Sequence, residues 1–566
     1  MGNLRPVLIM GLVFLAYMMW VQWQKDYGPA PQSTPSAQTQ PVEAVSAPDV
    51  PDFQDSPQAG QEDLPEAVNP NQPANAVAGT PEPAEQRPMV EVTTDVLRVR
   101  IDPQGGTVVS AVLRNYPVKL KEPDVKVQLL QSDSSGLFIA QSGLLSQQEA
   151  PNHTSVYRPQ RMEYTLAEGG ETLRVPMTWV SAGGVEVTKT FVFKKGRYDV
   201  DVEHRVVNRG AEAWTGSGYL QLQRTVPVDQ DDGGFTNPGR YSFFGIGFYS
   251  PEDKFEKISF DDVADESFKK TTDEGWLAMI QHYFFAAWIP RTEQAVVFTT
   301  QALQNGGWPR FIARGVTPAH RVAAGESTAF NSTLYIGPKL QDELPAIAPG
   351  LEYTVNYGIF TVFSKPLFWL LEKIHDVVGN WGWAIVMLTI LIKAAFFKLT
   401  EAQYRSTARM RKLQPRIEQL KERYGDDRQR MSQAMMEMYK KEKVNPLGGC
   451  LPILVQIPIF IALYWVLLES VELRQAPFIL WIDNLSVRDP YFILPALNAV
   501  FMFATQRLTP MVGMDPLQQK MMTMMPVVFS IMFAFFPAGL VLYWATNAGL
   551  SLAQQYYITR KIAAAD

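Results

Sequence analysis

This chain of 566 residues contains one cysteine and five histidines, and its net charge is small. Cys450 is the single cysteine, so an intramolecular disulfide and a cysteine-rich metal site are both excluded. The net charge of -6 is too mild for a protein whose main partner is DNA or another nucleic acid, because such proteins normally carry a strongly basic domain. The composition therefore predicts no metal, no cofactor and no DNA partner.

Lysine and arginine are absent between Asp26 and Gln86, in a segment rich in Pro, Ala, Gln and Glu. Residues 28–88 are therefore expected to form a disordered linker. An apolar stretch from Val7 to Trp23, long enough to cross a bilayer, precedes it. Because no small-residue cleavage site follows closely, we expect residues 1–27 to be an uncleaved transmembrane anchor rather than a secretory signal.

Residues 89–345 alternate between apolar and polar side chains, with frequent Gly and Pro. In "GVEVTKTFVFKKGRYDVDVEHRVVN" the apolar residues recur at every second position on both sides of a turn at 194–197. Such alternation is typical of strands that are buried on one face. The region is therefore predicted to be one large β-sandwich domain.

Long apolar runs return after Tyr357. Residues 357–380 have apolar side chains at helical spacing opposite charged ones, which predicts an amphipathic helix in the membrane interface. Five further runs predict spanning helices within a membrane core at 381–566: 381–400, 447–468, 490–508, 521–536 and 538–557. With the N-terminal anchor, the predicted fold class is a membrane protein with six transmembrane α-helices and a large β-domain.

The distribution of cations orients these runs. Residues 398–443 carry 13 Lys and Arg against 7 Asp and Glu, whereas residues 469–489 carry two cations against four acids. Because basic loops stay in the cytoplasm, the first segment is expected inside and the second outside. Alternation then places both termini in the cytoplasm and the β-domain in the periplasm of a bacterial cell, as a multi-pass protein of the inner membrane.

Asp and Glu are missing from the interiors of the five C-terminal runs, so a carboxylate relay of the kind used by proton-driven pumps is disfavoured. Lys393 lies within the first run, roughly 18 Å from Trp381 at about 1.5 Å per residue. Two interpretations are open. In the first, the flexible stem of Lys393 carries the ammonium group to the lipid headgroups. In the second, Lys393 faces a water-filled cavity, because a charged residue inside a membrane is costly and usually has a function. Thr389 and Thr400, at i-4 and i+7, would share its face of a continuous helix.

The other runs contain single polar residues, each of which is more often a helix-to-helix hydrogen bond than a functional group. Together with Lys393 and Thr389 they are predicted to line one hydrophilic groove. Its members are Gln456, Asn498, Thr505, Thr523, Ser530, Tyr543, Asn547, Ser551 and Gln554. A short fifth run implies a thinned bilayer, which would lower the cost of moving a short polar tail across.

Residues 401–446 are predicted to form a cytoplasmic helical hairpin, with an apolar seam from Leu413 to Tyr424, a turn at "GDD" and a returning methionine seam. The hairpin is either a solvated structural element or a surface for ribosomal RNA, anionic lipid or varied apolar segments. Its candidate contact residues are Arg405, Arg409, Arg411, Arg416, Met431 and Met435.

Three stretches carry a specific resemblance: "LTEAQYRSTARMRKLQPRIEQLKERYGDDRQRMSQAMMEMYKKEKVNPLGGCLPILVQIPIFIALYW", "VELRQAPFILWIDNLS" and "FFPAGLVLYW". They resemble the Gram-negative form of the YidC/Oxa/Alb family of membrane protein insertases, and the resemblance covers the whole chain. It implies an insertase and chaperone for integral membrane proteins, without enzyme activity, that works alone or with the Sec translocon through a groove open to cytoplasm and lipid. It also implies a periplasmic β-supersandwich of galactose-mutarotase type. The implied partners are nascent membrane proteins, the translocon proteins SecD, SecF and SecY, the ribosome and membrane lipids.

The same resemblance places Lys393 at the position of a groove arginine and Thr389 at that of its neighbouring threonine. It adds Trp544 to the groove, at a position where tyrosine is frequent, and Lys398 stands where the family often has proline. A lysine keeps the positive charge of arginine but lacks the planar fork that pairs with a carboxylate through two hydrogen bonds.

Two other classes of function are weighed against the insertase. A small-solute or ion transporter is disfavoured by the missing carboxylates. A periplasmic glycan-binding or sugar-processing domain on a membrane anchor would need a cleft with a paired acid and base. The candidate histidines fall in no recognisable constellation: His153, His204, His282 and His320.

Overall fold

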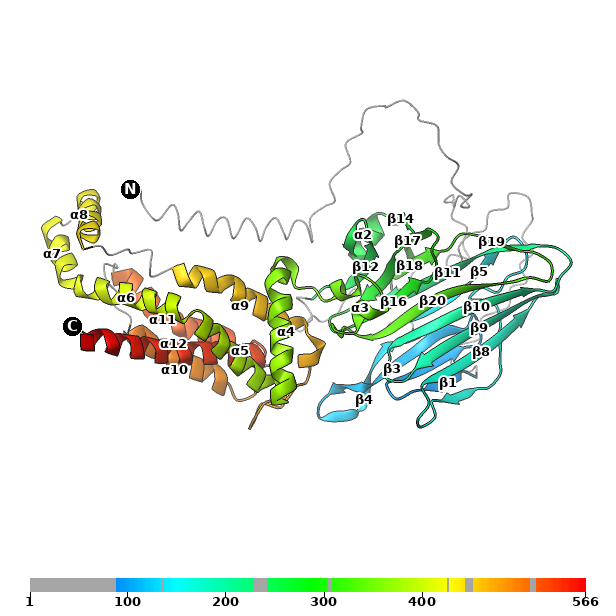
Figure 1. Ribbon diagram of the computed structural model, residues 1–566, viewed down its shortest axis with the longest axis horizontal. Helices are drawn as coiled ribbons and strands as arrows, with labels where there is room; N and C mark the ends of the chain where they lie inside the picture. Colours follow the sequence, from blue (N-terminus) through cyan, green and yellow to red (C-terminus); the bar gives the residue numbers. More distant parts are fainter. Residues whose placement is uncertain are drawn as a thin grey trace, which may run out of the picture.

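Figure 1 shows the computed structural model of the protein, in which a β-rich domain and a helical part follow one another along the long axis. The structure describes residues 88–133, 136–226, 242–303, 308–424, 427–442, 451–508 and 516–565. The predicted anchor at 1–27 and the predicted linker, apart from Pro88, lie outside these residues.

The β-domain contains two large sheets, antiparallel except where β1 pairs with β7. The 11-stranded sheet has the order β14 (Lys269–Thr272), β17 (Val296–Leu303), β18 (Arg310–Val316), β11 (Trp214–Thr225), β5 (Phe138–Ser146), β3 (Thr107–Lys119), β2 (Leu97–Asp102), β1 (Val90–Thr93) and β7 (Glu163–Thr165), with β19 (His320–Val322) beside β11 and β4 (Glu122–Leu130) beside β3. The 9-stranded sheet has the order β13 (Lys254–Ile258), β12 (Gly245–Ser250), β15 (Trp276–Ile280), β16 (Phe284–Pro290), β20 (Ser327–Pro338), β10 (Asp199–Asn208), β9 (Val185–Lys194), β8 (Thr172–Val180) and β6 (Arg158–Pro159).

The alternating pattern predicted for β9 is present, since Val187, Phe191 and Phe193 are all buried. Apolar residues of both sheets form one large core, and a smaller cluster contains Val187, so the domain is the β-sandwich that the pattern predicted. Lys189 lies on the same inward face and is fully buried. Its Nζ donates to the carbonyls of Gly105 at 2.8 Å and Ser142 at 3.0 Å, so backbone oxygens solvate this charge in place of water.

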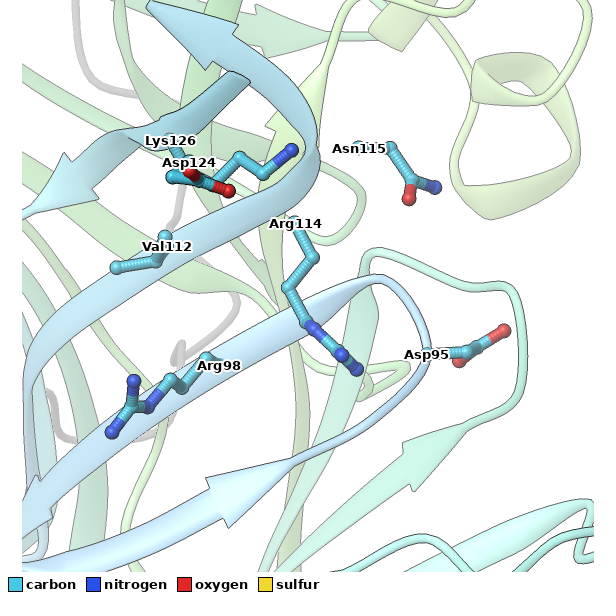
Figure 2. Close-up of a pocket in the computed structure, with 7 residues that line it drawn as sticks. All are labelled: Asp95, Arg98, Val112, Arg114, Asn115, Asp124 and Lys126. Carbon is cyan, nitrogen blue, oxygen red and sulfur yellow. The ribbon is translucent and has the colours of Figure 1, made fainter. Parts of the chain in front are cut away.

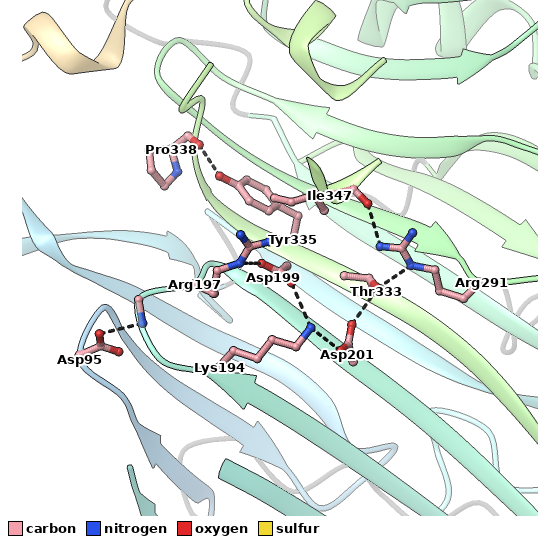
Figure 3. A network of polar contacts seen from close by, with 11 residues as sticks. Asp95, Lys194, Arg197, Asp199, Asp201, Arg291, Thr333, Tyr335, Pro338 and Ile347 are labelled. Atoms are coloured by element: carbon pink, nitrogen blue, oxygen red, sulfur yellow. Dashed lines mark hydrogen bonds and ion pairs between the residues drawn. The ribbon is translucent and has the colours of Figure 1, made fainter. Parts of the chain in front are cut away.

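The turn between β9 and β10 is held by a network of polar contacts (Figure 3). Asp199 accepts hydrogen bonds from Arg197 Nε at 2.7 Å and from Lys194 Nζ at 3.4 Å. Nearby, Arg291 donates to the Thr333 hydroxyl and to the carbonyl of Ile347, both at 2.9 Å. These contacts fix the end of the sandwich at which β20 leads into the helical part.

Short helices punctuate the β-domain and its exit: α2 (Phe260–Asp265), α3 (Leu344–Ile347), η4 (Leu351–Thr354) and η5 (Gly358–Phe360). The helical part then consists of α4 (Thr361–Val378), α5 (Trp381–Ala395), α6 (Phe397–Lys412), α7 (Gln414–Tyr424), α8 (Arg428–Lys441), α9 (Leu451–Glu469), η7 (Val471–Leu473), α10 (Ile493–Leu508), α11 (Pro516–Phe533) and α12 (Ala538–Ala565). In Figure 1, α4 lies across the ends of α5, α9, α10 and α12, on the side of the β-domain.

Local sequence explains the sharp corner between α4 and α5. Gly379 has φ of 70°, a left-handed conformation that glycine adopts without steric cost, and it ends α4. Asn380 follows as the N-cap of α5, its side chain accepting a hydrogen bond from the Trp383 amide at 3.1 Å. The apolar face of α4 that packs on the core contains Phe368, Leu371 and Ile374, whereas Phe363 is exposed.

Within the described residues, no single helix combines the length and apolarity needed to cross a bilayer. The predicted span at 381–400 is broken at Phe396, and α5 meets α6 at a bend of 61°. Together α5 and α6 as far as Ser406 have sufficient length and apolar character. The prediction of one straight helix here was wrong, and the number of six spans remains a prediction.

A buried polar seam joins the β-domain to the helical part, where α9 ends. Lys339 Nζ lies 4.0 Å from Glu469 Oε2, and these two side chains are 1% and 0% exposed. The same oxygen accepts a hydrogen bond from the Ser242 hydroxyl at 3.2 Å, and His282 Nε2 donates to the carbonyl of Leu468 at 2.9 Å. Burial lowers the pKa of His282 to about 3, so this imidazole is neutral at physiological pH. We call these contacts the domain seam.

Candidate functional site

Lys393 is the centre of a polar cluster inside the helical part. It lies in the last turn of α5 and is buried, together with Thr389 one turn earlier. Its Nζ donates to the Ser551 hydroxyl of α12 at 2.8 Å, and that hydroxyl donates to the carbonyl of Asn547 at 2.7 Å. The lysine therefore contacts α12 rather than extending along its own helix toward lipid headgroups.

Two further helices complete the cluster. Gln456 of α9 donates through Nε2 to Asn547 Oδ1 at 3.0 Å. Tyr404 of α6 donates to the carbonyl of Ser551 at 3.4 Å, and Gln554 of α12 lies 3.5 Å from the carbonyl of Lys393. We refer to Lys393, Tyr404, Gln456, Asn547, Ser551 and Gln554 as the polar cluster. The consecutive helices α5 and α6 thus meet α9 and the distant α12 at this point.

The cluster contains a positive charge without a negative partner. Among the described residues, no carboxylate forms an ion pair with Lys393, and Ser551 is the acceptor that its ammonium group contacts. A lysine ammonium group has three donors, so the cluster retains capacity for an additional acceptor. Hydroxyl and amide groups around the charge make it less costly to bury than a purely apolar site would.

Not every predicted groove residue joins this cluster. The Thr389 hydroxyl donates to the carbonyl of Ile385 in its own helix at 2.7 Å, although its position places it beside Lys393. Thr400 belongs to α6, so the break at Phe396 removes the i+7 relation to Lys393 that a continuous helix would have given. Asn498 of α10 is buried and contacts Met502 Sδ at 3.5 Å, whereas the Thr505 hydroxyl donates to the carbonyl of Phe501 at 2.8 Å.

Trp544 lies in an aromatic core, where it packs against Phe533 and Phe460 at ring-centroid distances of 3.6 and 5.3 Å. Tyr543 is buried between this core and the polar cluster, since its neighbours include Phe460, at a ring-centroid distance of 6.0 Å, and Gln456. In α11, Ser530 is buried and Thr523 is exposed. Polarity and the family resemblance had grouped these residues in one groove, whereas packing places Trp544 among aromatic rings.

Tyr404 is the cluster residue that sequence reasoning missed. It was assigned to the cytoplasmic hairpin because it follows Lys398, within the basic segment. Since α6 starts at Phe397, its first two turns remain within reach of α12. The apolar character of "AAFFKL" before the basic residues was the available signal.

The predicted hairpin at 401–446 comprises the end of α6 followed by α7 and α8. Leu413 and Ile417 are buried against Met435, Met438 and Tyr439, which supports a structural role for Met435. Met431 is half-buried and Arg409 is exposed. Arg405 and Arg416 form exposed ion pairs with Glu401 and Glu442, at 2.6 and 2.5 Å. The side chain of Arg411 and residues 425–426 of the turn lie outside the description.

The four histidines of the β-domain do not form an acid–base site. His153 Nδ1 contacts the Tyr219 hydroxyl at 2.7 Å, and His204 is buried on β10. His282 belongs to the domain seam, and His320 contacts Gln294 near the surface at 3.1 Å. They lie on separate strands and turns, and no group of three or more His, Cys, Asp or Glu among the described residues is arranged to hold a metal ion.

Comparison with known proteins gives consistent matches over both parts of the chain. Residues 89–370 match the YidC periplasmic domain, and residues 373–565 match the 60Kd inner membrane protein family. The membrane protein insertase YidC of Thioalkalivibrio sulfidiphilus is 48% identical over 99% of this chain and 99% of its own length. That of Methylococcus capsulatus is also 48% identical, with the same coverage. A crystal structure of an active YidC insertase matches 83% of this chain and 93% of its own, at 20% identity and a TM-score of 0.38.

Proposed function

We propose, on the premise that this chain belongs to the YidC family of membrane protein insertases, that the polar cluster around Lys393 receives the polar tail of a nascent membrane protein. The predicted insertase function agrees with the names of these relatives. An insertase moves polypeptide into the membrane and does not catalyse a reaction. Neither a transporter nor a glycan-processing enzyme is favoured.

The unpaired charge of Lys393 is the observation that carries the proposal. Among the described residues, its ammonium group donates to the neutral Ser551 hydroxyl and pairs with no carboxylate, so an acidic substrate residue would supply the missing ion-pair partner. A charge near the centre of a membrane costs about 2.5 to 3.5 kcal/mol on insertion scales. Retaining it is therefore best explained by a function that uses the charge.

The hydrogen bonds of the cluster suggest how the site resets. Ser551 accepts a hydrogen bond from Lys393 when no substrate is present, and the Asn547 carbonyl orients Ser551. Gln456 of α9 in turn donates to the side chain of Asn547. A carboxylate accepts a stronger, charge-assisted hydrogen bond than a hydroxyl does, so it displaces Ser551 from the ammonium group. When the carboxylate passes on, the neutral contact reforms.

The proposed topology places the β-domain in the periplasm and both termini in the cytoplasm, with six spans including the anchor. It is supported by the excess of cations in residues 398–443, at the end of the helical part opposite the β-domain. Lys393 would then lie in the cytoplasmic half, open to a tail arriving from that side. The galactose-mutarotase-like supersandwich, and contacts with the ribosome, lipids and SecD, SecF and SecY, are further parts of the proposal. For the ribosome, the exposed cations of α6 to α8 offer the contact surface.

Reconstitution in liposomes tests the role of the charge. We expect Lys393→Arg to retain insertion of a single-span substrate with an acidic tail, and Lys393→Ala and Lys393→Glu to lose it progressively. Lys373→Ala is the matched control, because Lys373 is an exposed lysine of α4 paired with Asp376. If all three Lys393 variants insert the substrate as well as the parent protein does, the charge has no role.

Crosslinking during translation tests the position of the substrate. A photoreactive residue at Gln456 should give adducts with the nascent chain, and its yield should fall when the acidic residues of the substrate tail are neutralised. The same residue at Val500, which is exposed on α10, is the control for contact with passing apolar segments. Adducts at Val500 alone would move the path of the substrate away from the cluster.

A further inference from the structure

The hairpin between β3 and β4 projects beyond the sandwich and ends in an exposed apolar tip. Residues 118–125 are all exposed, although the inner parts of both strands are buried. Val118, Leu120 and Val125 are 45%, 42% and 52% exposed, which is unusual for three apolar side chains on one short hairpin. We call residues 117–126 the hairpin tip.

Cations accompany these apolar side chains. Lys119 and Lys121 flank Leu120, so that basic and apolar residues alternate at the turn. Lys119 forms an exposed ion pair with Glu122 at 3.3 Å, and Lys121 forms none with a described carboxylate. Alternating apolar and basic groups at an exposed tip match a phospholipid surface, where side chains enter the acyl boundary and cations meet acidic headgroups.

The tip is fixed beside the helical part. Arg474 donates to the carbonyl of Pro117 at 2.8 Å, and Gln475 donates to the carbonyls of Pro117 and Val118 at 3.0 and 3.1 Å. These residues follow α9 and η7, so they lie at the outer end of the helices. In Figure 1 the hairpin reaches from the sandwich toward the end where α4 lies. Beyond Gln475, Leu480 is again an exposed apolar residue.

The depression at the base of the same hairpin is a weaker candidate for binding. It has a volume of about 550 Å³ and is lined by Asp95, Arg98, Val112, Arg114, Asn115, Asp124 and Lys126 (Figure 2). Several of its polar groups already have partners within the protein. Arg98 pairs with Glu91, Asp95 accepts a hydrogen bond from the Gly196 amide, and Arg114 donates to the carbonyl of Thr94. The apolar side chains of the tip are instead left to solvent.

We propose that the hairpin tip contacts the outer surface of the bilayer, with its apolar side chains at the acyl boundary and its lysines at acidic phospholipid headgroups. The inference rests on the proposed placement of the β-domain outside the membrane. It adds an attachment to lipid to the three that already join the β-domain to the helical part: the chain connection into α4, the domain seam, and the hydrogen bonds of Arg474 and Gln475 to the hairpin. Together these attachments hold the sandwich at a defined tilt above the outer end of the helices.

Site-specific fluorescence on the full chain tests this contact. In a Cys450→Ser background, Leu120→Cys is labelled with an environment-sensitive dye and reconstituted in vesicles that contain brominated phospholipids. Val180→Cys is the matched control, because Val180 is 65% exposed and ends β8 at the far side of the sandwich. Val180 lies opposite Glu186 of β9, at the end of the strands away from the β9–β10 turn. At that turn, Asp199 of β10 lies opposite Tyr335 of β20, close to the domain seam.

We expect brominated lipid to quench the dye at position 120 and to leave the dye at position 180 unquenched. Quenching should be stronger in vesicles with phosphatidylglycerol than in neutral ones, and Lys119→Glu with Lys121→Glu should remove that difference. Equal signals at 120 and 180 would overturn the proposal. A dye at 120 that is shielded from water but insensitive to bromine would indicate a second copy or another protein instead of lipid, which also overturns it.

Insertion of a single-span substrate is measured in the same vesicles, so that the two proposals fail separately. Normal insertion without quenching at 120 refutes the lipid contact and leaves the insertase site intact. Quenching at position 120 in vesicles whose insertion does not depend on the charge of Lys393 supports the lipid contact and refutes the proposed role of that charge.

Discussion

Breaking the ion pair in the domain seam should separate the β-domain from the helical part. Lys339 Nζ and Glu469 Oε2 are 4.0 Å apart and almost completely buried. At this distance two unit charges attract by about 4 kcal/mol at an effective dielectric constant of roughly 20. Burial lowers the pKa of Lys339, and the Glu469 carboxylate opposes this shift, so the partner favours the charged form of the lysine.

Removing one partner leaves the other charge buried and unpaired. We therefore expect Lys339→Met and Glu469→Leu each to lower the free energy of unfolding by about 3 to 5 kcal/mol. The double variant should cost far less than the sum, because replacing a buried pair with apolar side chains of similar size is often nearly neutral. Residual cost should come from the Ser242 hydroxyl, which loses its acceptor on Glu469.

Denaturant titration of the full chain in micelles measures these free energies, and hydrogen exchange at the amides of Val471 and Leu473 reports locally on the seam. The exposed pair Lys373–Asp376, at 3.0 Å, is the control with the same chemistry, and its disruption should cost far less because water screens the two charges. The reasoning is refuted if the two seam substitutions are additive, or if neither costs more than the control.

Three further predictions concern pH and packing. Burial lowers the pKa of Lys189 from 10.5 to about 7. Between these pH values the folded state binds fewer protons than the unfolded state, so the free energy of unfolding should rise with pH. Calorimetry of Lys189→Met should show that this rise is lost. Burial raises the pKa of Glu472 to about 7 from 4.5, so its contribution to stability is complete below pH 4.5 and is lost as pH rises through 7; Glu472→Gln should show a flatter profile over this window by the same measurement. Ile417→Ala should cost about 2 to 5 kcal/mol of local stability, because Ile417 is buried in the small core of α7 and α8, and hydrogen exchange there should accelerate while that of β9 stays unchanged.

Much of the architecture follows from short-range patterns in the sequence. The alternation in β9 and β10 predicted strands, because side chains two residues apart lie on the same face of a strand. Gly379 and Asn380 mark the corner between α4 and α5, because their conformational and capping preferences act within a few residues. The family resemblance and the predicted insertase function were confirmed by close full-length relatives.

The candidate site was only partly predictable. Lys393 attracted attention because a lysine in an apolar run is costly and therefore rare. Its partner Ser551 is 158 residues away, and helical spacing cannot say which faces of two distant helices meet. Trp544 was assigned to the groove with Ser551, and these residues lie seven positions, or about two turns, apart on nearly the same face of α12. Trp544 nevertheless packs among aromatic rings. One face of a helix meets different neighbours along its length, and those neighbours decide which stretch of it is polar.

The sequence by itself determined the division into a β-domain and a helical part, the basic segment, and the position of Lys393 within an apolar run. Each of these depends on residues that are close together in the chain, where periodicity and charge act directly. The tertiary structure decided that the first C-terminal apolar run bends at Phe396, that Ser551 holds Lys393, and that Lys339 meets Glu469. The last two features join residues more than 100 positions apart, and local preference carries no information about such contacts.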